Sequence, residues 1–121
     1  QDAVIASLHS IEEMIGGEIF VRKCSSIKII DLAKTISSDI KIIGKMPGEK
    51  INEMMIDNNE SENTFEFNDY FKTVPRIFSP EITNKMIVNG KKVKKDFEYV
   101  SNINGDWINK DKIKKLIKEF I

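Results

Sequence analysis

The fold is decided by the stretch Glu18-Ile19-Phe20-Val21-Arg22-Lys23. Its β-branched and aromatic centre is typical of a strand, and the two glycines just before it end any preceding helix. Residues 27–36 have helical spacing, and residues 39–43 are again strand-like. A strand, a crossover helix and a second strand in this length predict a βαβ unit, so we expect an α/β fold.

The flanking segments predict short strands with about three helices in all. Residues 64–74 alternate well enough for one strand, residues 51–56 and 82–88 fit more than one structure, and Asn109 or Asp111 can cap a last helix. A first helix is predicted over residues 2–15, with one buried stripe at helical spacing: Val4, Ile5, Leu8, Ile11, Met14 and Ile15.

Length and charge exclude several classes of protein. The chain has 121 residues, enough for about one domain, and its 19 basic and 19 acidic residues give a net charge of zero. Because no overall field attracts nucleic acid or an anionic membrane, we expect neither as a partner. No apolar run approaches the roughly 20 residues that cross a bilayer. The only cysteine, Cys24, excludes an internal disulfide, favours a cytoplasmic setting and is expected to be a partly buried structural thiol.

The charges that suggest a binding site lie around Pro47-Gly48, a pair that commits the backbone to a tight turn. Lys45 and Lys50 flank the turn, and Glu49 and Glu53 follow it. Cations on a rigid turn suit a diphosphate, and a carboxylate suits a pair of sugar hydroxyls. The alternative interpretation is an ordinary surface turn with solvated charges.

A self-sufficient active site is not visible in the sequence. The pair Gly16-Gly17 has the wrong spacing for a phosphate-binding loop, no His/Cys cluster could bind a metal, and neither tyrosine has a lysine four residues later. The residues alone therefore indicate a small α/β substrate-binding or interaction module, without a catalytic residue, cofactor site or metal site of its own.

Four short motifs occur in order along the chain and together resemble one family. They are Gly17–Lys23, Ile27–Ala33, the segment Ile42–Glu53 with its Pro-Gly-Glu-Lys turn, and Asp96–Asn102 followed by Trp107. This series is similar to the nucleotide-sugar 4,6-dehydratases of the extended short-chain dehydrogenase/reductase type. Among these it most resembles the inverting UDP-N-acetylglucosamine 4,6-dehydratases of pseudaminic acid and surface polysaccharide biosynthesis.

The resemblance covers the C-terminal, substrate-binding portion of that family. It implies that residues 1–121, with a tail segment at 96–121, are part of a longer lyase, and Gln1 at the start of a helical pattern agrees with this expectation. The NADP-binding Rossmann domain, which carries a Tyr-x-x-x-Lys pair, would lie outside this sequence. The resemblance further implies a UDP-sugar substrate, a homo-oligomer when full length, and no activity for this fragment alone.

The resemblance also assigns substrate-binding residues one by one. Glu49 matches the family glutamate after Pro-Gly, Glu53 matches a second glutamate, and Lys23 matches a strand lysine. Met46 stands where the family has a phosphate-clamping arginine, and methionine donates no hydrogen bond. Lys45 next to it could supply a point charge instead. The loss of the arginine leaves an alternative function open, a non-catalytic α/β interaction module that has lost sugar binding.

Overall fold

The computed structural model describes residues 2–120, so the two ends of the expected domain, Gln1 and Ile121, lie outside the described residues. The chain divides into two compact units. The first unit comprises Gln1–Lys23 and Met55–Tyr99, and the second comprises Cys24–Met54 and Val100–Ile121.

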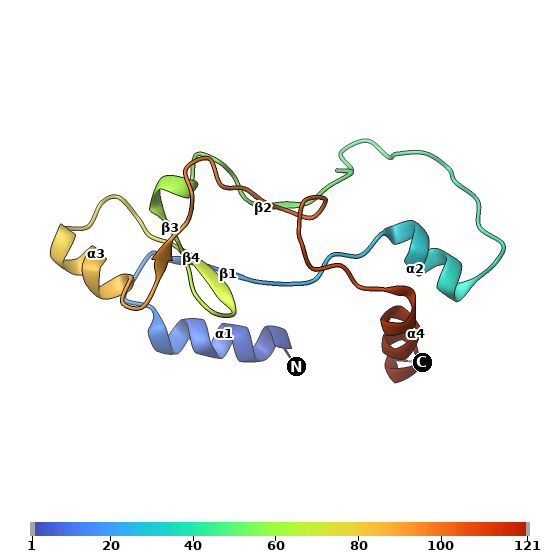
Figure 1. The fold of residues 1–121 in the computed structure, drawn as a ribbon, viewed down its shortest axis with the longest axis horizontal. Helices are drawn as coiled ribbons and strands as arrows, with labels where there is room; N and C mark the ends of the chain where they lie inside the picture. Colours follow the sequence, from blue (N-terminus) through green and yellow to red (C-terminus); the bar gives the residue numbers. More distant parts are fainter. Residues whose placement is uncertain (1, 121) are drawn as a thin grey trace. The chain divides into compact units, whose positions relative to one another are not determined.

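The elements confirm the α/β class. The described residues form four α-helices, one more than expected, because the ambiguous segment near residue 82 is helical. In chain order (Figure 1) the elements are α1 (Asp2–Glu13), β1 (Ile19–Arg22), α2 (Ile29–Ile36), β2 (Met54–Ile56), a 3-10 helix (Ser61–Asn63), β3 (Thr64–Glu66), β4 (Tyr70–Thr73), α3 (Pro80–Met86), β5 (Lys91–Lys92), β6 (Tyr99–Val100) and α4 (Lys110–Phe120).

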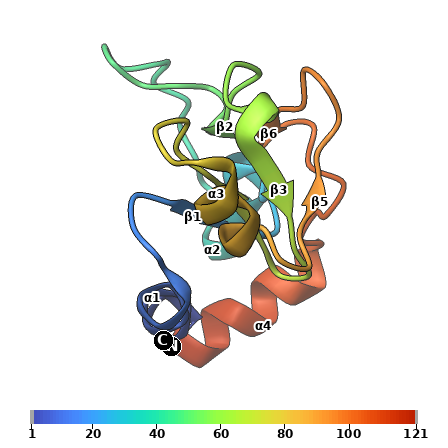
Figure 2. The ribbon, with the colours of Figure 1, turned by 90° about the vertical axis from the view of Figure 1, so that its left-hand side faces the viewer.

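The first unit is built on a four-stranded sheet of order β1-β4-β3-β5, in which the paired strands are antiparallel. Val21 pairs with Phe71 in the β1–β4 ladder, and β3 runs beside β5 (Figure 2). The expected single strand over residues 64–74 is wrong, because it is the hairpin of β3 and β4. The Phe67 N–H donates to the Tyr70 carbonyl at 2.9 Å across Asn68 and Asp69, two residue types that favour turns.

The predicted βαβ unit is also wrong. Residues 39–43 form no strand, and the side chains of Ile42 and Ile43 are 81% and 79% exposed. A strand needs a neighbour for its backbone groups, and β1 takes its neighbour from β4 in the antiparallel direction. The β2–β6 pair is a separate two-stranded sheet. Helix α2 is therefore not a crossover between parallel strands.

The hydrophobic core cluster among the described residues lies in the first unit. In the first unit Val21, Ile56 and Phe71 are buried, and the Phe71 ring contacts those of Phe97 and Tyr99 at centroid distances of 5.2 and 5.1 Å. In the second unit Ile113 of α4 is buried. The expected cap of α4 is confirmed at Asn109, whose side-chain oxygen accepts the Lys112 N–H at 2.9 Å.

The apolar stripe of α1 is not buried as expected, since the helix has no buried residue. The side of α1 that meets the sheet carries small and polar residues instead, among them Ser10 and Glu13, and the Tyr70 hydroxyl donates to the Glu13 carboxylate at 2.7 Å. The spacing of apolar residues predicted the helix correctly. The helix nevertheless contacts the sheet through the face opposite the apolar stripe.

Candidate functional site

The Pro-Gly turn forms as the sequence predicts. The Glu49 N–H donates to the Met46 carbonyl at 3.1 Å, and Gly48 has φ of +85°, the sign that a type II turn requires at its third residue. The Glu49 carboxylate also accepts the Met46 N–H at 2.8 Å through one oxygen. Glu49, a predicted binding residue, therefore also stabilises the turn through its side chain.

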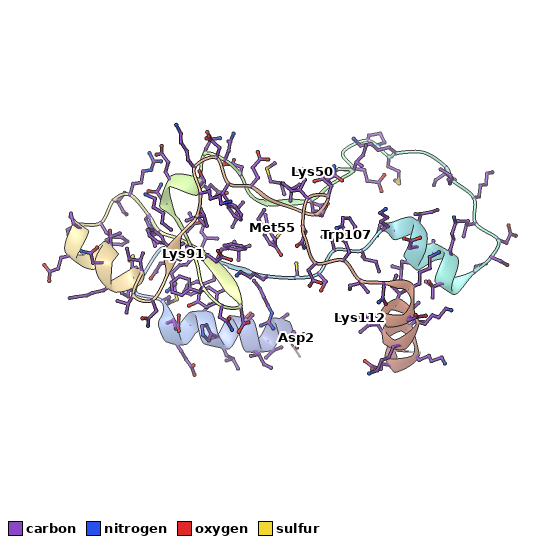
Figure 3. All side chains as sticks on the ribbon, viewed as in Figure 1. Asp2, Lys50, Met55, Lys91, Trp107 and Lys112 are labelled. Carbon is purple, nitrogen blue, oxygen red and sulfur yellow. The ribbon has the colours of Figure 1, made fainter. Side chains whose placement is uncertain are left out.

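The turn lies in a long irregular segment, residues 37–53, whose far end is fixed to the tail of the chain. The Glu53 N–H donates to the Ser101 hydroxyl at 3.0 Å, and the Ser101 N–H donates to the Glu53 carbonyl at 2.8 Å. The side chains of Lys45, Met46 and Glu49 are exposed, as is Lys50 (Figure 3). Four of the five expected site residues therefore lie on one exposed segment of the second unit.

Lys23 lies in the first unit, at the end of β1. Its ammonium group pairs with the Glu66 carboxylate at 2.7 Å and lies 5.0 Å from the centre of the Phe71 ring. These contacts link β1 to β3 and to the core. Lys23 therefore has a structural role in this unit, whatever it contributes to binding.

Sequence reasoning missed that the tail of the chain docks onto the residues after β1. The Asn104 side chain donates to the Cys24 carbonyl at 2.7 Å and to the Ser26 hydroxyl at 3.1 Å. The Ile108 N–H donates to the Ser26 carbonyl at 2.9 Å, and Trp107 (Figure 3) lies 5.8 Å from the Lys28 ammonium group. Two of the motifs that carried the family resemblance therefore meet within the second unit.

Cys24 differs from the expectation of a partly buried thiol, since it is exposed. Its carbonyl is used by Asn104, so the backbone at this position is fixed although the side chain faces solvent. The main-chain carbonyl of Cys24 therefore contributes to the docking of the tail.

A hollow of about 380 Å³ in the first unit was also missed. Arg22 lines it from β1, and its guanidinium has no ion-pair partner among residues 2–120. The other main lining side chains are Ile5, His9, Phe20, Asp69 and Tyr70. The sequence does not reveal the strand order. The pairing of β1 with β4, which brings these lining residues together, could therefore not be predicted.

The glycine pair does not fit the phosphates of NADP. The N–H groups of Ile15 and Gly16 donate to the two oxygens of the Glu18 carboxylate at 2.9 and 2.6 Å. Glu18 is buried, so this group of donors already holds a fixed negative charge. A phosphate at the same place would be repelled. The N–H groups of Ile15 and Gly16 are therefore already used by Glu18.

Glu18 and Glu13 should make the first unit sensitive to acid. Burial raises the pKa of Glu18, but the N–H donors around its carboxylate outweigh burial and hold the pKa below the ordinary value of about 4.3. The hydrogen bond from Tyr70 lowers the pKa of Glu13. Because both pKa values are lower when folded, their stabilisation is present above the unfolded pKa and is lost as the pH falls through the folded one.

We therefore expect Glu18→Gln to reduce the acid sensitivity of folding. At pH 7 the variant should lose about 1–2 kcal/mol of unfolding free energy, because a charge-assisted pair of hydrogen bonds is weakened. The wild type should lose more unfolding free energy than the variant between pH 7 and pH 3, in urea titrations followed by circular dichroism. Equal losses in both proteins would show that Glu18 is not the responsible carboxyl.

The described residues lack two further features. Between residues 2 and 120 there is no group of three or more His, Cys, Asp or Glu side chains arranged to bind a metal. No helix in this part of the chain has the length and apolarity needed to span a bilayer.

A family model and curated proteins match this chain. Residues 1–75 match the family model described as polysaccharide biosynthesis protein. The chain is 37% identical to the inverting UDP-N-acetylglucosamine 4,6-dehydratase of Campylobacter jejuni, over 97% of this chain and 37% of that protein. It is 36% identical to an uncharacterized membrane protein of Methanocaldococcus jannaschii, over 86% of this chain and 32% of that protein.

A solved structure supports the fold. The X-ray structure of Pen from Bacillus thuringiensis superposes with a TM-score of 0.79 at 25% identity, over 98% of this chain and 36% of that one. The chain therefore spans about a third of the length of these proteins.

Proposed function

The chain belongs to the family of polysaccharide biosynthesis proteins, and from this membership we propose that it supplies the substrate-binding part of a UDP-N-acetylglucosamine 4,6-dehydratase. The observation that carries the proposal is the 37% identity to the inverting enzyme of Campylobacter jejuni over 97% of this chain. An exposed turn with charged side chains, at the place where the family motif has its nucleotide contacts, agrees with it.

Glu49 is the principal binding residue in this proposal. One carboxylate oxygen accepts the Met46 N–H and keeps the turn closed, which leaves the other oxygen for substrate hydroxyls. Because the turn fixes the carboxylate before the ligand arrives, little side-chain entropy is lost on binding. Glu49 thus selects a hydroxyl-bearing ligand at its free oxygen.

The diphosphate contact is assigned to Lys45. Its ammonium group forms no ion pair with the described carboxylates, so it is available as a point charge beside the turn. Met46 adds only an apolar surface, Glu53 lies on the same segment, and Lys23, in the first unit, stays a prediction of the family resemblance. A single lysine binds a diphosphate less specifically than the bidentate guanidinium of the family motif.

The role of this chain is to bind and orient the sugar nucleotide, not to oxidise it. Since the glycine pair holds Glu18 and not a phosphate, no step through NADP is assigned to these residues, and the 121-residue chain alone is expected to be inactive. In the proposal the NADP site and the catalytic groups belong to a Rossmann domain of a longer, homo-oligomeric cytoplasmic lyase, which acts in pseudaminic acid or surface polysaccharide biosynthesis.

The test is calorimetric titration of the 121-residue chain with UDP. Wild type should bind in the millimolar range, a weak affinity that suits one wall of a pocket. Glu49→Gln keeps an oxygen for the Met46 N–H but removes the charge, and it should weaken binding about tenfold, as expected for a lost charge-assisted hydrogen bond.

The matched control is Glu12→Gln, a change of the same kind at an exposed position of α1. It should leave the dissociation constant for UDP unchanged. Equal affinities of wild type and Glu49→Gln, or no binding of UDP by the wild type, would overturn the proposed role of this turn.

A further inference from the structure

The most prominent unexplained surface of the first unit is the outward face of α1. Three large apolar side chains follow one another there at intervals of four and three residues: Val4, Leu8 and Ile11, here called the outer stripe. All are exposed, with Leu8 at 57% and Ile11 at 67%. This spacing is that of a helix seam built to pack against another apolar surface.

The outer stripe cannot turn inward, because contacts on the other side of α1 fix the helix. Glu13 accepts the Tyr70 hydroxyl at 2.7 Å and lies 3.6 Å from the Lys72 ammonium group. The His9 ring meets the Tyr70 ring edge-on at a centroid distance of 5.3 Å. At 100° per residue, Glu13 lies on the side of the helix opposite the stripe. The stripe therefore needs an occupant from elsewhere.

The size of the outer stripe argues against a second copy of this chain as that occupant. A helix of 12 residues is about 18 Å long, whereas stable interfaces bury about 1,200–2,000 Å². Two such helices cannot reach that area. A covalently attached partner needs much less area, because its effective concentration is already in the millimolar range or above.

We propose that polypeptide preceding residue 1 in a longer protein packs against the outer stripe. The surface that this polypeptide presents to the stripe is apolar and uncharged. Relatives in which this chain covers only 37% of the length have ample polypeptide to supply that surface. The stripe itself carries no charge, so an apolar surface matches it without desolvating an ion. The inference rests on the proposed function only in assuming a longer, dehydratase-like chain.

Hydrogen exchange of the α1 amides tests this directly. The part of the Campylobacter jejuni dehydratase that lies before the matched region is fused in front of residue 1, and the fusion is compared with the 121-residue chain by mass spectrometry. Amides of residues 2–13 should exchange at least about tenfold more slowly in the fusion, because a covered helix opens less often.

The double variant Leu8→Ser/Ile11→Ser should abolish this protection in the fusion and change exchange little in the 121-residue chain. Ala3→Ser, an exposed position off the stripe, is the control and should preserve the protection. Equal exchange in the fusion and the chain would overturn the proposal. So would faster exchange of the double variant in the chain alone, since the occupant would then be within these residues or a second copy.

These outcomes do not depend on nucleotide binding. If UDP does not bind but the α1 amides are protected in the fusion, the proposed function is refuted and the proposed covering of the outer stripe is supported. If UDP binds as expected but the α1 amides are not protected in the fusion, the proposed function is supported and the covering of the outer stripe is refuted.

Discussion

Replacing Lys72 with alanine should destabilise the first unit by about 2–3 kcal/mol, a large share of the stability of a domain of this size. Lys72 is 4% exposed and lies at the centre of β4. Its ammonium group donates to the Met86 carbonyl at 3.1 Å and lies 3.6 Å from the Glu13 carboxylate. It is also 4.7 Å from the centre of the Phe20 ring and 5.1 Å from that of Phe67.

The reason for the large effect is that one cation serves α1, the sheet and the end of α3 at once. Alanine would remove the cation–π contacts, leave the Met86 carbonyl without this donor and open a cavity among the rings. Glu13 is partly exposed, so water recovers part of its lost pairing and limits the total.

Urea unfolding followed by far-ultraviolet circular dichroism measures the change. Lys72→Met keeps the aliphatic volume without the charge and should cost less than alanine but more than zero. Lys91→Ala, at an exposed position of edge strand β5, is the matched control and should change stability by less than about 0.5 kcal/mol. An alanine variant at position 72 that unfolds at the wild-type urea concentration would refute the structural role of this cation.

Restoring the arginine of the family motif, Met46→Arg, should raise the affinity for UDP about 10- to 100-fold. Met46 is 61% exposed and its backbone is fixed on both sides by Glu49, so a longer side chain can be added without disturbing the turn. A bidentate guanidinium–phosphate contact is a charge-assisted hydrogen bond that contributes about 1.5–3 kcal/mol.

The control for added charge is Ile51→Arg, in the same segment, where the side chain is 84% exposed. It should increase affinity only slightly, and the small increase should disappear at high salt. If both arginine variants bind UDP as the wild type does, the alternative function is favoured, a non-catalytic interaction module that has lost sugar binding.

Local structure could be predicted from the sequence where the signal is itself local. The strand at Ile19–Arg22, the helix end at the glycine pair, the Asn109 cap and the Pro-Gly turn all depend on residues within a few positions of one another. Asn89, with φ of +65°, lies in the left-handed region that asparagine tolerates better than most residues, in the turn after α3.

Partners that are distant in sequence could not be predicted. Residues 39–43 have the composition of a strand, but composition does not reveal whether a neighbouring strand exists. The spacing in α1 identifies an apolar face without saying that this face would remain exposed. Lys72 reads as the polar residue of an alternating strand. Its burial depends on aromatic rings brought together from β1, β4 and the turn between β3 and β4.

The candidate site divides in the same way. Lys45, Met46, Glu49 and Glu53 are close in sequence and remain together on one segment, as expected. The docking of Asn104 onto Cys24 and Ser26 joins positions about 80 residues apart, and no local pattern indicates it.

The most direct test of nucleotide binding at the Met46–Glu49 turn is a titration of the ¹⁵N-labelled 121-residue chain with UDP, followed by amide chemical shifts. We expect the largest shift changes at Lys45, Met46 and Glu49, with saturation in the millimolar range. Shift changes confined to other residues, such as those lining the hollow beside Arg22, or no change at all, would contradict binding at this turn.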